Sequence, residues 1–244
     1  MLEHIPYCFN LNEIKQYFNN TDCLNSWLRT RIKNKSIKRV RNGLYVSLDS
    51  MGQVTSTKYE IGSKVTGDCF ISYHSALEYY GFANQTFNTL TISTKSRFTS
   101  FEFDGIEYEC KISKNNVQIK EYSNVMVSSL ERTIIDCIDD ISLSGGIEEI
   151  LNALEQIKYL DEKKLIEVLD SYNKIILHKK VGFLLELFKE SLSLSNDFFD
   201  YCVDKLSNHV DYLLNDYFND IGYISKWKLM APVSFESYFN GGIK

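Results

Sequence analysis

The stretch Asn25–Leu48, NSWLRTRIKNKSIKRVRNGLYVSL, decides how the first part of the chain folds. Apolar side chains recur at the spacing of one helical face, beginning one residue before the stretch, at Leu24, Trp27, Leu28 and Ile32. This period predicts a helix over Cys23–Asn34 whose apolar stripe is turned inward. The opposite stripe of that helix holds Ser26, Arg29, Thr30 and Lys33.

The second half of the stretch has the pattern of a β-hairpin. Asn42-Gly43 lies between two strand-like runs, Ile37–Arg41 and Leu44–Leu48, and Asn-Gly in such a place favours a two-residue turn. That turn would pair Arg41 with Leu44, Arg39 with Val46 and Ile37 with Leu48, which puts Arg39 and Arg41 on one face near the tip. A helix followed by a basic hairpin is how a winged helix-turn-helix ends.

Basic residues crowd this segment. Seven of the thirteen residues from Arg29 to Arg41 are bases, and no acid occurs between Cys23 and Leu48. Residues 1–48 carry a net charge of +5 and the remainder −10, so the asymmetry favours a polyanionic partner for the first part. The plain alternative is a solvated basic face. We predict promoter DNA as the partner, contacted by Ser26, Arg29, Thr30, Lys33, Lys35, Lys38, Arg39, Arg41 and Asn42.

Caps, turns and alternation predict the other elements. Asn10 with Glu13 forms a capping box that predicts a helix over Leu11–Phe18, and a further helix is expected over Ser72–Tyr80. Strands are predicted at Thr89–Thr94, Phe98–Phe103, Ile106–Ile112 and Val125–Val127, with Asp104-Gly105 as a tight turn.

The last hundred residues have a mainly helical pattern. We expect helices near 146–157, 161–171, 178–191, 196–206 and 208–218, and then an extended segment at Gly222–Met230. The fold class predicted from these elements is α+β. A winged helix-turn-helix-like module over 1–50 would precede a second domain over 51–244. That domain would hold a small antiparallel sheet in its β-containing part, about 65–128, and a helical part at about 129–220.

Composition excludes several classes of protein. No run of eighteen apolar residues occurs, which argues against a membrane-spanning protein, and the first residues, MLEHIPYCFN, lack the pattern of a signal peptide. The six cysteines are scattered and form no C-x-x-C pair, so we expect neither a zinc knuckle nor a redox motif. We expect a cytoplasmic protein without a membrane partner.

Motifs of catalysis are scarce. The four histidines form no H-E-x-x-H, and neither G-x-G-x-x-G nor a phosphate-binding Walker loop occurs. Asp104, Glu109 and Lys111 resemble the acid and lysine set of metal-dependent nucleases, and this remains the minor enzymatic alternative. The main prediction is a non-enzymatic protein without cofactor or metal.

The segment Ser129–Asp136, SLERTIID, predicts the start of a helix. Ser128 and Glu131 have the spacing of a capping box, and Arg132 and Asp136 can pair at i, i+4. Two interpretations stay open. Glu131, Arg132 and Asp136 form either a surface ion pair at a helix start or a polar face on which a protein partner docks.

Several of these segments together resemble one known family, the AbiEi proteins. The segments that carry the resemblance are NGLYV at Asn42–Val46, ISYHSALEYYGF at Ile71–Phe82, TISTKSR at Thr91–Arg97, SLERTIID at Ser129–Asp136 and KVGFLLE at Lys180–Glu186. The likeness spans about residues 25–230, and it rests on the order and spacing of short motifs. The chain departs from a full winged helix-turn-helix in showing two helices, not three, before the wing.

The resemblance implies a function in two parts. AbiEi proteins are antitoxins and transcriptional autoregulators of bacterial abortive-infection toxin–antitoxin systems. The N-terminal module would then bind inverted repeats in its own promoter, and the larger part would counteract a nucleotidyltransferase toxin of the AbiEii kind. An effector-responsive transcriptional regulator without a toxin partner is the alternative.

Overall fold

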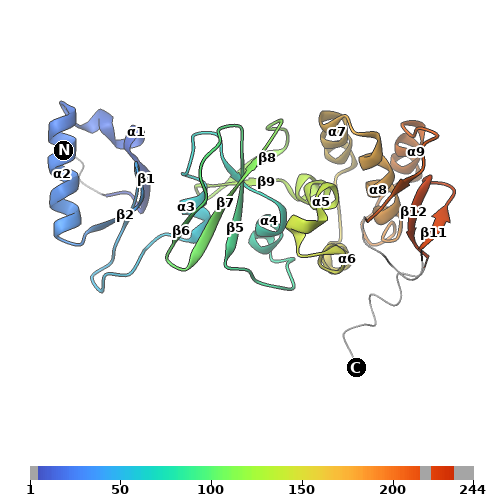
Figure 1. The fold of residues 1–244 in the computed structure, drawn as a ribbon, viewed down its shortest axis with the longest axis horizontal. Coiled ribbons are helices and arrows are strands. Elements are labelled where there is room, and N and C mark those ends of the chain that lie inside the picture. Colours follow the sequence, from blue (N-terminus) through green and yellow to red (C-terminus); the bar gives the residue numbers. More distant parts are fainter. Residues whose placement is uncertain (1–4, 215–220, 234–244) are drawn as a thin grey trace, which may run out of the picture. The chain divides into compact units, whose positions relative to one another are not determined.

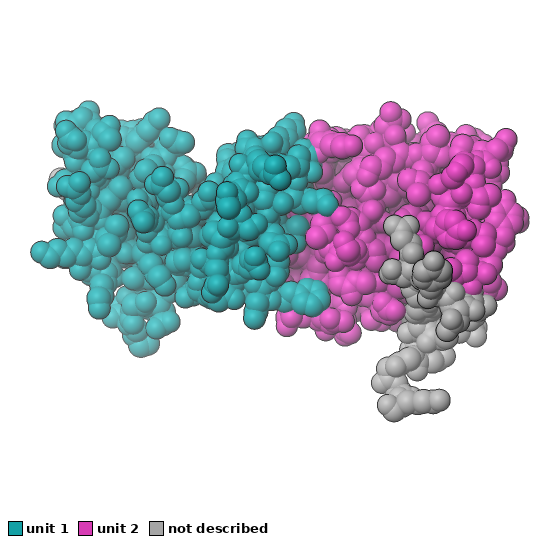
Figure 2. Space-filling model, in the orientation of Figure 1, with its two compact units in different colours: residues 1–71, 87–113, 120–127 teal, residues 72–86, 114–119, 128–244 magenta. Residues whose placement is uncertain are grey.

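The computed structural model describes residues 5–214 and 221–233 of the chain. It has an α+β fold, as predicted, in which three sheets alternate with helices along the chain (Figure 1). The chain divides into two compact units, coloured separately in Figure 2: residues 1–71, 87–113 and 120–127 form unit 1, and residues 72–86, 114–119 and 128–244 form unit 2. The expected boundary at residue 50 therefore falls inside unit 1, between its N-terminal module and its larger sheet.

The N-terminal module is a three-stranded sheet with helices on one face. Strand β1 (Cys8–Asn10) leads into α1 (Leu11–Ile14), the single 3₁₀ turn η1 (Lys15–Tyr17) and α2 (Thr21–Lys33), and β2 (Ile37–Arg41) and β3 (Leu44–Ser47) close the sheet in the order β1-β3-β2. The predicted Asn10–Glu13 capping box is present, with both hydrogen bonds formed. The first helix ends earlier than expected, because a 3₁₀ turn replaces its second half.

The core of this module lies between α2 and the sheet. Leu24 and Leu28 of α2 pack with Phe9 and Tyr45 of the strands, whose rings stack 5.7 Å apart. The inward apolar stripe predicted for the second helix is therefore confirmed at Leu24 and Leu28, whereas Ile32, expected in the same stripe, is exposed. Helix α2 begins two residues before the expected start, because the Asn20 side chain accepts the backbone N–H of Cys23 at 2.8 Å and caps it.

The hairpin register differs from the prediction. Arg41 does pair with Leu44, but Arg39 pairs with Tyr45, Lys38 with Val46 and Ile37 with Ser47, because Val40 is an extra residue between Arg39 and Arg41. In such a β-bulge, two residues of one strand lie opposite a single residue of the partner strand. The side chains beyond the bulge then point to the opposite face of the sheet from the one they would otherwise occupy. The expectation that Arg39 and Arg41 share a face is therefore wrong.

A six-stranded sheet makes up the rest of unit 1. Its strands are β4 (Phe70–Ile71), β5 (Thr89–Thr94), β6 (Phe101–Phe103), β7 (Ile106–Ile112), β8 (Ile119–Tyr122) and β9 (Val125–Ser128), in the order β6-β7-β5-β4-β9-β8. The predicted β6–β7 hairpin turns at Asp104-Gly105. The sheet is mixed and not antiparallel as expected, because β5 pairs with β7, and β4 with β9, in parallel. Helix α3 (Lys58–Gly62) packs against this sheet.

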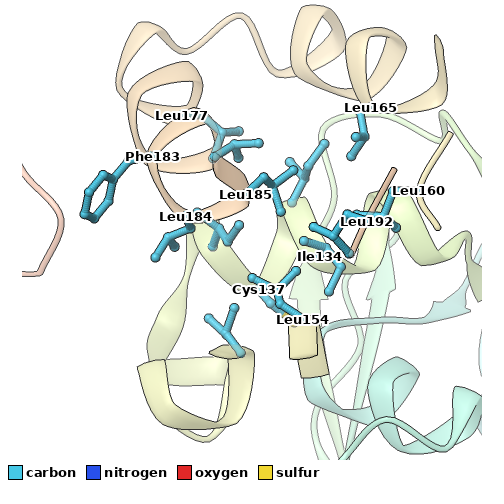
Figure 3. Packing of buried hydrophobic residues seen from close by; sticks show 14 of the residues in the cluster. Ile134, Cys137, Leu154, Leu160, Leu165, Leu177, Phe183, Leu184, Leu185 and Leu192 are labelled. Atoms are coloured by element: carbon cyan, nitrogen blue, oxygen red, sulfur yellow. The ribbon is translucent and has the colours of Figure 1, made fainter. Parts of the chain in front are cut away.

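Helices dominate unit 2. They are α4 (Tyr73–Tyr80), α5 (Leu130–Asp139), η2 (Ile141–Ser144), α6 (Ile147–Gln156), α7 (Glu162–Tyr172), α8 (Ile175–Glu186) and α9 (Asn196–Asp204). Their apolar faces meet in one cluster, and Figure 3 shows its leucines gathered around Ile134 and Cys137 of α5. The predicted helices 146–157, 161–171 and 196–206 are confirmed within two residues at each end. The one predicted over 178–191 begins and ends several residues earlier.

The end of unit 2 is a small sheet. Strands β10 (Asp211–Tyr212), β12 (Leu229–Pro232) and β11 (Ile221–Ile224) lie in the order β10-β12-β11. The helix predicted over 208–218 is wrong for its described part, since Asp211 and Tyr212 pair in parallel with Leu229 and Met230. Residues 215–218 of that prediction lie outside the described residues. The segment expected to be extended is a hairpin of β11 and β12. In the part of the chain described, no helix has the length and apolar character needed to cross a membrane.

Candidate nucleic-acid interface

The outer face of α2 presents the helical part of the predicted interface. Ser26, Arg29, Thr30 and Lys33 are all exposed, on the side away from Leu24 and Leu28. The Thr30 hydroxyl donates to the Ser26 carbonyl at 2.9 Å within the helix. Among the described residues, Arg29 and Lys33 have no hydrogen-bond or ion-pair partner for their side chains, so both charges face solvent.

Three further predicted residues are also open to solvent. Lys35 follows the end of α2, and Arg39 and Asn42 lie on the hairpin. Arg39 stands opposite Tyr45, which itself stands opposite Phe9, so these three residues share the sheet face that carries α2. The structure therefore brings Arg39 to the same side of the module as the bases of α2.

Lys38 and Arg41 lie on the other face of the hairpin. They stand opposite Val46 and Leu44, and both of those side chains are buried although they do not belong to the core formed with α2. The Lys38 ammonium is 4.8 Å from the centre of the Phe103 ring and 3.9 Å from the Asp104 carboxylate. These two bases are thus directed toward the chain's own larger sheet and away from the α2 face.

The residues expected to form a docking face on α5 are buried. Glu131 is 6% exposed, and Arg132 and Asp136 are 1% exposed, so they are parts of the core and the predicted docking face is wrong. The i, i+4 pair does form, with 3.4 Å between Arg132 Nε and Asp136 Oδ2, but it is not at the surface. Ser128 and Glu131 do not form the expected capping box either, since Ser129 caps the helix by accepting the Arg132 N–H.

The buried charges of α5 are held by a dense hydrogen-bond network. Arg132 donates to the Asn115 side chain at 3.0 Å and to the Val117 carbonyl, and the Tyr172 hydroxyl donates to Asp136. Burial raises the pKa of the Asp136 carboxyl to about 6, against the opposing effects of the Arg132 charge and the Tyr172 hydrogen bond. Glu131 accepts the backbone N–H of Asp161 at 3.2 Å. The network links α5 to the 114–119 segment and to α7. These three residues therefore stabilise the fold.

The proposed nuclease residues belong to the β6–β7 hairpin. Asp104 is at the turn with φ of +55°, and Glu109 and Lys111 are half-buried on β7. The backbone of the Asp-Gly turn and the contact with Lys38 account for Asp104. Within residues 5–214 and 221–233, no group of three or more His, Cys, Asp or Glu side chains is arranged to hold a metal ion.

The sequence analysis did not identify the aromatic residues that Lys38 and Arg41 contact. Phe98, Phe101 and Phe103 line the segment that enters the β6–β7 hairpin, and the Phe101 ring stacks on Tyr108 at 4.8 Å. Their close spacing in RFTSFEF was a visible signal. It did not reveal the bases opposite them, which come from a segment about sixty residues earlier.

Comparisons with known proteins bear on the fold only. No protein-family model matches the chain, and no curated protein matches it. Among solved structures, it is similar to the Rv2827c protein from Mycobacterium tuberculosis, with a TM-score of 0.64 and 10% sequence identity over 93% of this chain and 86% of that one. At this identity the likeness shows a shared fold.

Proposed function

We propose that this protein is a DNA-binding antitoxin of the AbiEi kind, which represses its own promoter and counteracts a nucleotidyltransferase toxin. The observation that supports the DNA-binding half most directly is that the exposed bases Arg29, Lys33 and Arg39 lie on one side of the module. Lys35 is also exposed, just past the end of α2. A fixed group of free cations attracts the phosphates of duplex DNA.

The order of elements supports a winged-helix module. The chain runs from β1 through two short helical segments and α2 into the β2–β3 hairpin, and β1 pairs with β3 to give the order β1-β3-β2. In this arrangement α2 takes the place of the recognition helix and the hairpin takes the place of the wing. Ser26 and Thr30 would then face base edges, while Arg29, Lys33, Lys35 and Arg39 would contact phosphates.

A gel-shift assay with the chain's own promoter tests this half. Arg29→Gln combined with Lys33→Gln should weaken binding to the inverted repeats at least tenfold, since two phosphate contacts are lost. The matched control is Lys163→Gln, an exposed lysine on α7 in unit 2, which should leave binding unchanged. If the double variant of α2 binds as tightly as the wild-type protein, α2 is not the interface.

Antitoxin activity would reside outside the basic segment. Residues 49–244 carry a net charge of −10, and such a surface would speed encounter with a basic partner. Co-expression with the toxin encoded beside it, followed by size-exclusion chromatography, should give one stoichiometric peak. Two separate peaks at micromolar concentration would argue against direct binding and for neutralisation without a complex.

One cavity favours the alternative of an effector-responsive regulator. A cavity of about 620 Å³ lies beside the hairpin tip, and it is lined by residues that include Asn10, Asn42, Lys64 and Thr66. A small molecule there would touch the proposed wing directly. Growth separates the two functions: the antitoxin should rescue cells that produce the neighbouring toxin, whereas a regulator alone should repress the promoter without rescue.

A further inference from the structure

The bulge at Val40 divides the basic residues of the hairpin into two sets. Directly opposed residues of an antiparallel pair point to the same side of a sheet, so Arg39 lies with Tyr45 and Phe9, on the side of α2. Lys38 and Arg41 lie with Val46 and Leu44, on the other side. Without the extra residue, Arg41 would point the same way as Arg39.

The Arg41 guanidinium is held against two aromatic rings, that of Phe101 on β6 and that of Phe98 in the segment just before it. Its central carbon is 5.4 Å from the centre of the Phe98 ring and 4.9 Å from that of Phe101. Its Nη1 is buried and has no hydrogen-bond partner among the described residues. Aromatic faces attract a cation without a hydrogen bond, and this attraction is stronger where water is excluded.

Lys38, on the same strand β2, makes the same kind of contact with a second ring of β6. Lys38 lies over the Phe103 ring and beside Asp104, although both ends of that ion pair are more than half exposed. Phe101 and Phe103 belong to β6, which is the edge strand of the larger sheet. The two bases therefore contact the rings on one face of this edge strand.

We propose that Arg41, with Lys38 as its weaker companion, is a positioning residue and not a DNA contact. It fixes the module on the rings of Phe98 and Phe101, at the start of the β6–β7 hairpin, and so sets the direction in which α2 and Arg39 face. The docking itself is independent of DNA. Its consequence for promoter affinity rests on the proposed function.

Hydrogen exchange measured by mass spectrometry tests the docking directly. In Arg41→Gln the peptide over 98–108 should exchange roughly fivefold faster than in the wild-type protein, because a partly desolvated cation–π contact has been lost. Arg41→Lys, which keeps the positive charge, should retain most of the protection of the wild-type protein. The matched control is Arg39→Gln, on the other face, which should leave this peptide unchanged.

Promoter binding supplies the second measurement. Arg39→Gln should reduce the slope of log affinity against log salt by about 1, since a phosphate contact is lost. Arg41→Gln should lower the affinity severalfold with the slope unchanged. A reduced slope for Arg41→Gln together with unchanged exchange would overturn the proposal and make Arg41 a phosphate contact. If the wild-type protein binds no promoter DNA, the proposed function fails, and the exchange experiment still decides the docking.

Discussion

Arg132 is a charged residue in the core. Its guanidinium is buried in unit 2, where it pairs with Asp136 and donates to Asn115 and Val117. Removing one member of a buried pair leaves the other charge without compensation. We therefore expect this side chain to contribute to folding far more than any exposed base does.

Arg132→Met should lower the free energy of unfolding by about 3–5 kcal/mol, because the Asp136 carboxylate and the Val117 carbonyl lose their donor. Urea unfolding followed by circular dichroism measures this loss. Lys163→Met, at an exposed position of α7, should change the stability by less than about 0.5 kcal/mol. Equal stability of the two variants would show that the buried network contributes nothing.

The raised pKa of Asp136 predicts a dependence of stability on pH. The folded-state pKa of about 6 exceeds the ordinary value of 3.8, so the contribution of this group is fully present below pH 3.8 and is lost as pH rises through about 6. Each pKa unit corresponds to about 1.4 kcal/mol, which makes the whole contribution about 3 kcal/mol.

Urea titrations of the wild-type protein and Asp136→Asn between pH 4 and 7 isolate this group. The difference in unfolding free energy between the two proteins should change by about 2 kcal/mol in favour of the variant as pH rises through this range, since part of the contribution is already lost at pH 4. Other carboxyl groups titrate equally in both proteins and cancel in the difference. A difference that stays constant with pH would mean that the Asp136 carboxyl titrates normally.

At the scale of elements, α8 packs against the C-terminal sheet through a glycine. A Cβ at Gly182 would lie 2.2 Å from the ring of Trp227, which is fully buried and donates its indole N–H to Glu186 at 2.7 Å. The indole cannot move aside without losing that hydrogen bond. Close contact between the two elements therefore needs glycine at this place in the helix.

Gly182→Ala should destabilise the protein by about 1–3 kcal/mol, although alanine favours a helix by up to about 1 kcal/mol over glycine. Urea unfolding of the single variants and the double variant with Trp227→Leu tests the cause. In the Trp227→Leu background the same change should be neutral or stabilising, since the ring is gone. Additive effects of the two changes would rule out the close contact as the reason.

The elements also show what local sequence can and cannot predict. The Asn10–Glu13 capping box and the Asp104-Gly105 turn were correctly predicted, because a cap or a tight turn depends on residues within a few positions. The bulge at Val40 and strand β10 were missed. Both depend on partners across a sheet, and the partner of Asp211 is Leu229, far along the chain.

In the candidate site, too, features that depend on neighbouring residues were predictable, and features that depend on distant segments were not. Exposure of Arg29 and Lys33 is a consequence of the helical period of their own segment, and the structure confirms it. The direction of Arg41 was not predictable, because it requires both the bulge and the rings of Phe98 and Phe101. Burial of Arg132 escaped prediction for a similar reason, since its acceptors Asn115 and Val117 come from another segment.

At the scale of the whole molecule, the uneven distribution of charge along the sequence corresponds to separate parts of the structure. The exposed bases of the proposed interface lie on the N-terminal module, within residues 29–39, and the remaining chain is acidic overall. A polyanion and a protein partner can then be bound by different surfaces of one chain. This separation predicts that changes on α2 weaken promoter binding without weakening protection from a toxin.

The salt dependence of promoter binding tests the central claim most directly. Fluorescence anisotropy with a labelled promoter duplex should give a linear fall of log affinity with log salt for the wild-type protein. The slope should be smaller by about 3 in the triple variant Arg29→Gln, Lys33→Gln and Arg39→Gln, because about one counterion is released for each phosphate contact. A wild-type slope near zero, or the same slope in both proteins, would contradict the account.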